Sequence, residues 1–170
     1  AFVRTGDGTD TLKLGNVGGN ADVKTGWGHD DVTNAGGVQG FLTIDLGLGN
    51  DTLSTYAGGG ASVIAASGDD NITITDSNGD VTVKAGSGNN TMNVRITDSS
   101  VDDGTFLAGD DVDNLTFFGY GHLNATLRGG NDVVNADRVD QQMNLSLGEG
   151  DDLLDLSSSS NLTYNSLKSD

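Results

Sequence analysis

The sequence predicts an all-β parallel β-solenoid, also called a β-helix or β-roll, with about eight rungs of about 20 residues and two short strands per rung. Three observations support this fold class: one short motif returns along the whole chain, its spacing is nearly constant, and the residues around it alternate between apolar and polar. The motif is Gly-x-Gly-x-Asp-x-apolar. Its acidic position recurs every 19 to 23 residues, at Asp10, Asp30, Asp51, Asp70, Asn90, Asp113, Asp132 and Asp152.

Each copy begins with a glycine turn directly before the acidic residue. Five copies carry both glycines, namely Gly6 and Gly8, Gly26 and Gly28, Gly47 and Gly49, Gly86 and Gly88, and Gly148 and Gly150. Three copies keep one glycine: Gly68, Gly109 and Gly130. In the sixth copy Asp111 is an alternative to Asp113, but Asp113 is preferred because Leu115 and Phe117 then face inward. We therefore expect an edge of stacked Gly-Asp turns.

Two strands of alternating pattern surround each turn. In the first copy Leu12 and Leu14 alternate with Thr11 and Lys13, which is typical of a strand with one buried face. Counting from the acidic residue, positions nine and seven before it and two and four after it are predicted to be inward. This rule selects Leu42, Ile44, Leu53, Ala61, Val63, Ile72, Ile74, Val81, Val83, Met92, Val94, Leu123, Ala125, Val134, Ala136, Met143, Leu145, Leu154 and Leu156.

Composition restricts the class further. The repeat occupies the whole chain, so residues 1–170 are expected to form one domain, a mature form or segment of a secreted protein. The net charge is −17, and all but one of the acidic residues are Asp. The eight Lys and Arg form no basic stripe, which argues against nucleic acid, and no apolar run is long enough for a membrane span.

A row of stacked carboxylates requires a counter-charge. Carboxylates about 4.8 Å apart would repel by about 3 kcal/mol per pair at an effective dielectric constant of 20. Ca²⁺ is bound by six to eight carboxylate and carbonyl oxygens, and a Gly-x-Gly turn exposes carbonyls. The expected calcium ligands are therefore the Asp and Asn residues of the row, Asp111 as the alternative, and the turn glycines named above. A metal-free ladder held by hydrogen bonds is the alternative.

The repeat resembles that of RTX proteins, whose Gly-Gly-x-Gly-x-Asp-x-U-x nonapeptides form a calcium-binding parallel β-roll. The segments 5–13, 46–54, 85–93 and 147–155 match from the second glycine onward. The resemblance implies several calcium ions. The family carries two nonapeptides per turn and this chain one, so the ions are expected along one edge only.

No catalytic set is recognisable, so the chain is predicted not to be an enzyme. His29 and His122 are isolated, and Trp27 lies in a turn where it could contact a glycan or another partner. The expected function is an extracellular or cell-surface calcium-binding structural or adhesive module of a surface layer, fibre or adhesin. Its expected partners are neighbouring repeats or its own copies, end to end. A non-catalytic module of a secreted polysaccharide-active enzyme and an ice-binding solenoid are the alternatives.

Overall fold

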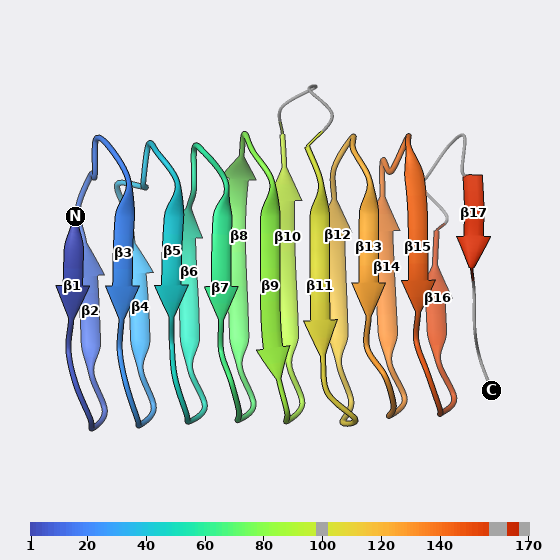
Figure 1. Ribbon diagram of the computed structural model, residues 1–170, viewed down its shortest axis with the longest axis horizontal. Coiled ribbons are helices and arrows are strands. Elements are labelled where there is room, and N and C mark those ends of the chain that lie inside the picture. Colours follow the sequence, from blue (N-terminus) through green and yellow to red (C-terminus); the bar gives the residue numbers. More distant parts are fainter. Residues whose placement is uncertain (98–101, 157–162, 167–170) are drawn as a thin grey trace.

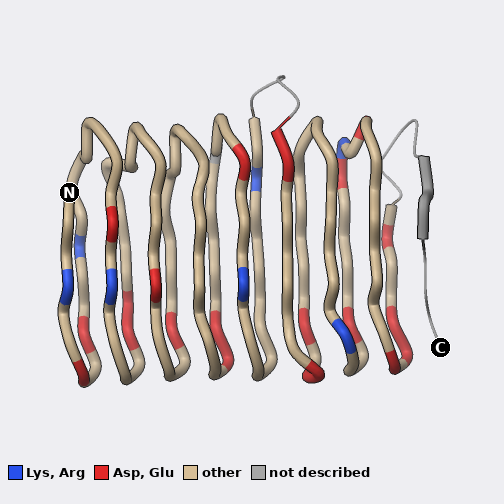
Figure 2. The backbone as a smooth tube through the Cα atoms, viewed as in Figure 1, with Lys and Arg blue, Asp and Glu red and all other residues tan. Residues whose placement is uncertain are grey.

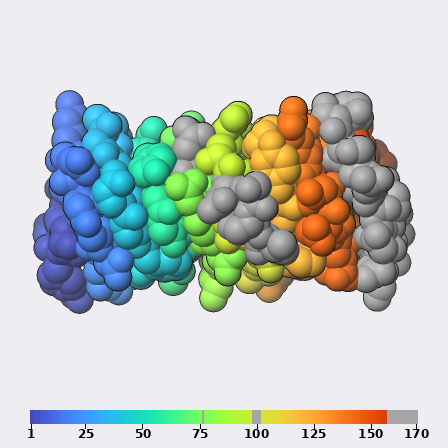
Figure 3. All heavy atoms as spheres, turned by 90° about the horizontal axis from the view of Figure 1, so that it is seen from above, coloured from blue at the N-terminus to red at the C-terminus, as the bar shows by residue number. Residues whose placement is uncertain are grey.

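The chain forms a parallel β-solenoid of about seven turns of about 20 residues, with two strands per turn. This computed structural model describes residues 1–97, 102–156 and 163–166. The two strands of each turn belong to two sheets that face each other, and the rungs follow one another along a rod (Figures 1 and 3). The predicted fold class is confirmed.

The strands alternate between the two sheets along the chain. The nine-stranded sheet contains, in spatial order, β1 (Phe2–Arg4), β3 (Ala21–Lys24), β5 (Leu42–Asp45), β7 (Ala61–Ile64), β9 (Val81–Gly86), β11 (Gly104–Ala108), β13 (Leu123–Thr126), β15 (Gln142–Ser146) and β17 (Thr163–Ser166). The eight-stranded sheet contains β2 (Thr11–Leu14), β4 (Asp31–Asn34), β6 (Thr52–Tyr56), β8 (Asn71–Ser77), β10 (Thr91–Ile96), β12 (Asn114–Phe118), β14 (Val133–Asp137) and β16 (Leu153–Asp155). Neighbouring strands in each sheet are parallel.

Strand register follows the repeat. In the eight-stranded sheet Thr52 pairs with Asn71, Asn71 with Thr91, and Thr91 with Asn114. Each of these residues directly follows an acidic position of the motif, so the longer spacing in the sixth copy is absorbed outside the paired strands. This register places Asp113, and not Asp111, in the row of acidic residues.

The apolar core lies between the sheets. The residues predicted to be inward are buried, except that Leu12 and Leu14 in the first copy and Leu154 and Leu156 in the last are only partly buried. At the sixth copy the rings of Phe106 and Phe117 meet edge to face, with centroids 5.7 Å apart. The sequence rule missed the buried Val38, Ala57, Ile96 and Val139, and it also missed a position five residues before the acid, which is buried in every copy but the first. It is occupied by Thr25, Leu46, Ala65, Ala85, Ala108, Leu127 and Leu147.

Glycine is required where successive turns touch. Gly49 has a φ of +134°, and a Cβ built on it would lie 1.7 Å from the carbonyl oxygen of Gly28 in the preceding rung. Gly8 has a similar φ of +119°, but a Cβ there would meet nothing within 4 Å. Comparing the two positions separates backbone strain from contact between rungs.

We expect Gly49→Ala to destabilise the protein far more than Gly8→Ala. The Gly8 variant suffers only the strain of positive φ, about 1–2 kcal/mol. The Gly49 variant must also push two rungs apart, which adds about 2–4 kcal/mol. Urea unfolding followed by circular dichroism measures both. Equal losses in the free energy of unfolding for the two variants would contradict the close stacking of the turns.

Candidate functional site

The acidic residues of the motif form one continuous ladder along the edge where each chain turn enters the eight-stranded sheet. Figure 2 shows this recurrence of acidic residues at the lower edge of the solenoid. In every step, a side-chain Oδ1 accepts a hydrogen bond from the backbone N–H of the ladder residue one rung earlier. The seven donor-to-acceptor pairs are Asp10 to Asp30, Asp30 to Asp51, Asp51 to Asp70, Asp70 to Asn90, Asn90 to Asp113, Asp113 to Asp132 and Asp132 to Asp152, at 2.8 to 3.1 Å.

The second oxygen of each ladder aspartate is buried without a hydrogen-bond partner. This holds for Oδ2 of Asp10, Asp30, Asp51, Asp70, Asp113, Asp132 and Asp152. The five inner aspartates are almost inaccessible, for example Asp70 at 2% and Asp113 and Asp132 at 0% exposed, whereas Asp10 and Asp152 at the two ends of the ladder are half-buried. A buried polar atom without a partner costs about 1–3 kcal/mol, and more when it is charged. The ladder therefore contains a repeated, unmet requirement for a proton or a cation.

Burial dominates the electrostatics of the ladder. Desolvation raises the pKa of Asp70 to about 7 and the pKa values of Asp113 and Asp132 to about 6, from an ordinary value of 3.8. The pKa of Asp51 is also raised, again mainly by desolvation. Hydrogen bonds from the backbone N–H groups of the preceding rung oppose these shifts without cancelling them.

Asn90 shows what surrounds the second side-chain atom in a ladder position. Its Oδ1 accepts the ladder bond, as in the aspartates. Its amide Nδ2 donates to the carbonyl oxygen of Gly88 at 2.8 Å and to Oδ1 of Asp113 at 3.0 Å. Two oxygen acceptors thus surround the position that Oδ2 occupies in an aspartate. Of the eight ladder residues, all described by the structure, Asn90 alone has partners for both side-chain polar atoms.

A second, exposed ladder runs beside the first and was not predicted. It is formed by the residue just before the ladder acid, and its hydrogen bonds run in the opposite direction. Nδ1 of His29 accepts from the N–H of Asn50, Oδ1 of Asn50 from Asp69, and Oδ1 of Asp69 from Asn89, at 2.8 to 3.0 Å. The frequent Asn and Asp at this position are the sequence signal that could have indicated it.

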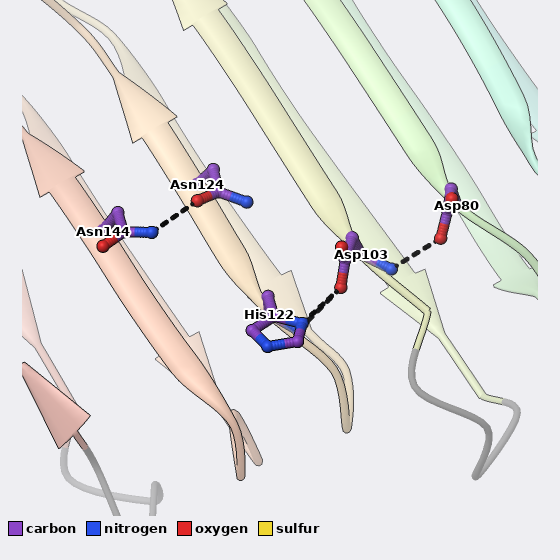
Figure 4. A network of polar contacts seen from close by, with 5 residues as sticks. All are labelled: Asp80, Asp103, His122, Asn124 and Asn144. Atoms are coloured by element: carbon purple, nitrogen blue, oxygen red, sulfur yellow. Dashed lines mark hydrogen bonds and ion pairs between the residues drawn. The ribbon is translucent and has the colours of Figure 1, made fainter.

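The opposite edge of the rod carries a separate polar network (Figure 4). Oδ1 of Asp80 accepts from the N–H of Asp103, and Oδ1 of Asp103 contacts both the N–H and Nδ1 of His122, at 3.1 and 2.7 Å. Nearby, the amide of Asn144 donates to Asn124. His122, considered isolated from the sequence, is therefore held by Asp103, and His29 lies in the second ladder on the other edge.

The turn glycines lie in the turns before the ladder residues, and from Gly26 onward they stack on the carbonyls of the preceding rung. Asp111 lies outside the ladder, exposed, with its Oδ2 accepting from the N–H of Gly88 at 2.8 Å. Among the described residues, no group of three or more His, Cys, Asp or Glu side chains converges in the manner of a metal site. A cation at the ladder would thus take most of its ligands from backbone carbonyls.

Comparison with protein-family models, with curated proteins and with solved structures gives no match to this chain. The structure establishes a parallel β-solenoid with a buried Asp ladder. No helix in the described part of the chain has the length and apolar character needed to cross a membrane.

We expect Asp70→Asn to stabilise the protein in chelator at pH 7.5 by about 1 kcal/mol. The new amide can donate in the way that Asn90 does, while the ladder bond to the N–H of Asp51 is kept. Asp69→Asn, which makes the same charge change on the exposed neighbour, is the control and should change stability little. Denaturant unfolding measures both variants, and a loss of stability in Asp70→Asn would contradict this account of the ladder.

Proposed function

We propose that the chain is a calcium-stabilised structural or adhesive β-solenoid of an extracellular or cell-surface protein, such as a surface layer, fibre or adhesin. The observation that carries this proposal is the row of seven buried aspartate Oδ2 atoms without a partner. Each ladder aspartate supplies one such atom, so the carboxylates follow one another along a single edge, interrupted at Asn90.

The atoms around the ladder suit a hard cation. The Nδ2 of Asn90 donates to the carbonyl oxygen of Gly88 and to the carboxylate of Asp113 in the next rung. In an aspartate, the corresponding Oδ2 would therefore be surrounded by oxygens. Ca²⁺ accepts this mixture of carboxylate and backbone carbonyl ligands and tolerates irregular geometry. When bound, the ion would neutralise the stacked carboxylates. The ladder Asp and the carbonyls of the turn glycines are the residues that would hold it.

The resemblance to the RTX repeat supports the same ion. The matching residues of the motif are the glycines that bring the turns together and the aspartate that forms the ladder. One motif per rung restricts the proposed ions to one edge. A rod stiffened by stacked, metal-linked turns suits a load-bearing or spacing role outside the cell, where calcium is abundant.

Calcium should reverse the pH dependence of stability. Without calcium, the raised pKa values of Asp70, Asp113 and Asp132 mean that the folded protein binds protons more tightly than the unfolded chain. Their stabilising contribution is full below about pH 4 and is lost as the pH rises through 6 to 7. With calcium, deprotonated carboxylates are required, so stability should rise over the same interval.

Thermal unfolding with excess chelator and with excess calcium, each from pH 4.5 to 8, tests this reversal. Magnesium at the same ionic strength controls for general screening. Coincident curves with and without calcium across the whole range would contradict the proposed function.

The ladder position should govern calcium stoichiometry. Asp51→Asn keeps the hydrogen bond from the N–H of Asp30 but removes the anion, so it should lower the number of bound ions measured by isothermal titration calorimetry. Asp31→Asn makes the same charge change on an exposed residue of β4, which pairs with Thr52 in the next rung, and is the matched control. An equal effect of the two substitutions would indicate nonspecific attraction to the −17 chain and not a ladder site.

A further inference from the structure

The edge of the nine-stranded sheet carries a groove that the calcium proposal does not use. We call it the Trp27 groove; Arg4, Lys24, Asp45, Gly26, Trp27 and Leu48 line it, and its volume is about 350 Å³. From this groove we infer a binding site for an acidic polysaccharide, in which Trp27 stacks on a uronic-acid pyranose ring and Arg4 binds its carboxylate. The inference goes beyond the proposed function and does not depend on calcium at the ladder.

The groove arises from three columns of residues in register. Arg4, Lys24 and Asp45 end strands β1, β3 and β5 and pair with one another across the sheet. Trp27 pairs with Leu48 in the adjacent turns. Between these two columns lies the column of Gly6, Gly26 and Gly47, which has no side chains. The result is a depression with a charged wall on one side and an apolar wall on the other.

The apolar wall is unusually exposed. The side chain of Trp27 is 65% exposed and that of Leu48 is 44% exposed. Trp27 is the only tryptophan in the chain, and few aromatic residues occur elsewhere. An indole ring supplies a rigid apolar face, and the axial C–H groups of a pyranose form a matching flat apolar face. A volume of this size lies within the range of small-molecule sites.

The charged wall selects an acidic sugar. Lys24 is paired with Asp45 at 3.1 Å, whereas Arg4 forms no ion pair among the described residues and lies over the ring of Phe2. The guanidinium is therefore available to bind a carboxylate through two parallel hydrogen bonds. The carboxylate of Asp45 can accept hydrogen bonds from the sugar hydroxyls, and the ammonium group of Lys24 can donate to them.

Further cavities lie along the same turns. A second cavity of about 520 Å³ includes Lys84 and Arg128 together with Asp110 and Asp111, and a third of about 660 Å³ includes Arg128 together with Asp110 and Glu149. Arg4, Lys24, Lys84 and Arg128 together make up half of the eight Lys and Arg of the chain. Because both cavities mix cations with carboxylates, the site for the acidic sugar is confined to the Trp27 groove, where Arg4 and Lys24 face the single carboxylate of Asp45.

Binding can be followed directly, because Trp27 alone reports tryptophan fluorescence. Titration with a galacturonate trisaccharide should change its emission, and the corresponding galactose trisaccharide should bind about tenfold more weakly, since it lacks the carboxylate. By isothermal titration calorimetry, Trp27→Ala should weaken trigalacturonate binding by at least about tenfold. Arg4→Met should abolish the preference for the acidic sugar.

Two matched controls should leave binding unchanged. Ser67→Ala alters the same turn position two rungs further on, and Arg95→Met removes an exposed arginine from β10 in the other sheet. Calcium titration of Trp27→Ala should match that of the unaltered protein. A failure of the sugar-binding inference is therefore distinguishable from a failure of the calcium proposal. Absence of any fluorescence change or heat, or equal binding by Trp27→Ala, overturns the inference. Binding of an acidic peptide but not of trigalacturonate also overturns it, in favour of a protein partner.

Discussion

The hydrogen bond between a ladder side chain and the backbone of the preceding rung is the constraint on which this structure depends. Where the chain leaves a glycine turn, the N–H of the ladder residue is directed along the rod and needs an acceptor one rung away. A short, fixed side chain with an oxygen at its end provides it, as Oδ1 of Asp51 does for Asp30. Glu would place that oxygen one methylene further out, which is consistent with a chain containing 24 Asp and one Glu. The repeated Asp is thus a structural requirement before it is a candidate ligand.

The same bond leaves the second carboxylate oxygen of each ladder aspartate buried without a partner. An aspartate has two equivalent oxygens, and the ladder uses only one of them. Asn90 shows that an amide resolves the conflict completely, because its Nδ2 donates to both neighbouring oxygens. A ladder built only for metal-free stability could use Asn in every rung. This chain uses Asp in seven rungs of eight, each with a buried, unpartnered Oδ2, and that choice supports a ligand that requires negative charge.

Periodicity was sufficient to predict the fold because every rung repeats the same local structure, two short strands joined by a glycine turn. The inward positions, the ladder at Asp113 and the exposed Trp27 follow from counting residues and alternating faces. Counting could not indicate the direction of the ladder bonds, since Asp30 could equally accept from the rung before or after it. The second ladder was missed because its members, from His29 to Asn131, differ in residue type. Asp103 and His122 hold the same position in successive rungs, ten residues before Asp113 and Asp132, but no repeated residue type at that position signals their contact.

The glycine column connects the two proposed sites. Because Gly26 and Gly47 carry no Cβ, successive turns approach to within contact of each other's carbonyl oxygens, which sets the short spacing that the ladder bonds need. The missing side chains also leave the floor of the Trp27 groove open. An alanine in this column would therefore both separate the rungs and fill the groove. The motif thus places buried carboxylates on the inner side of the turn and leaves the Trp27 groove open on its outer side. Trp27 and Leu48 supply the apolar wall of that groove and Arg4 supplies a cation beside it, so an acidic sugar would be anchored there, directly over the glycines that also bring the rungs together.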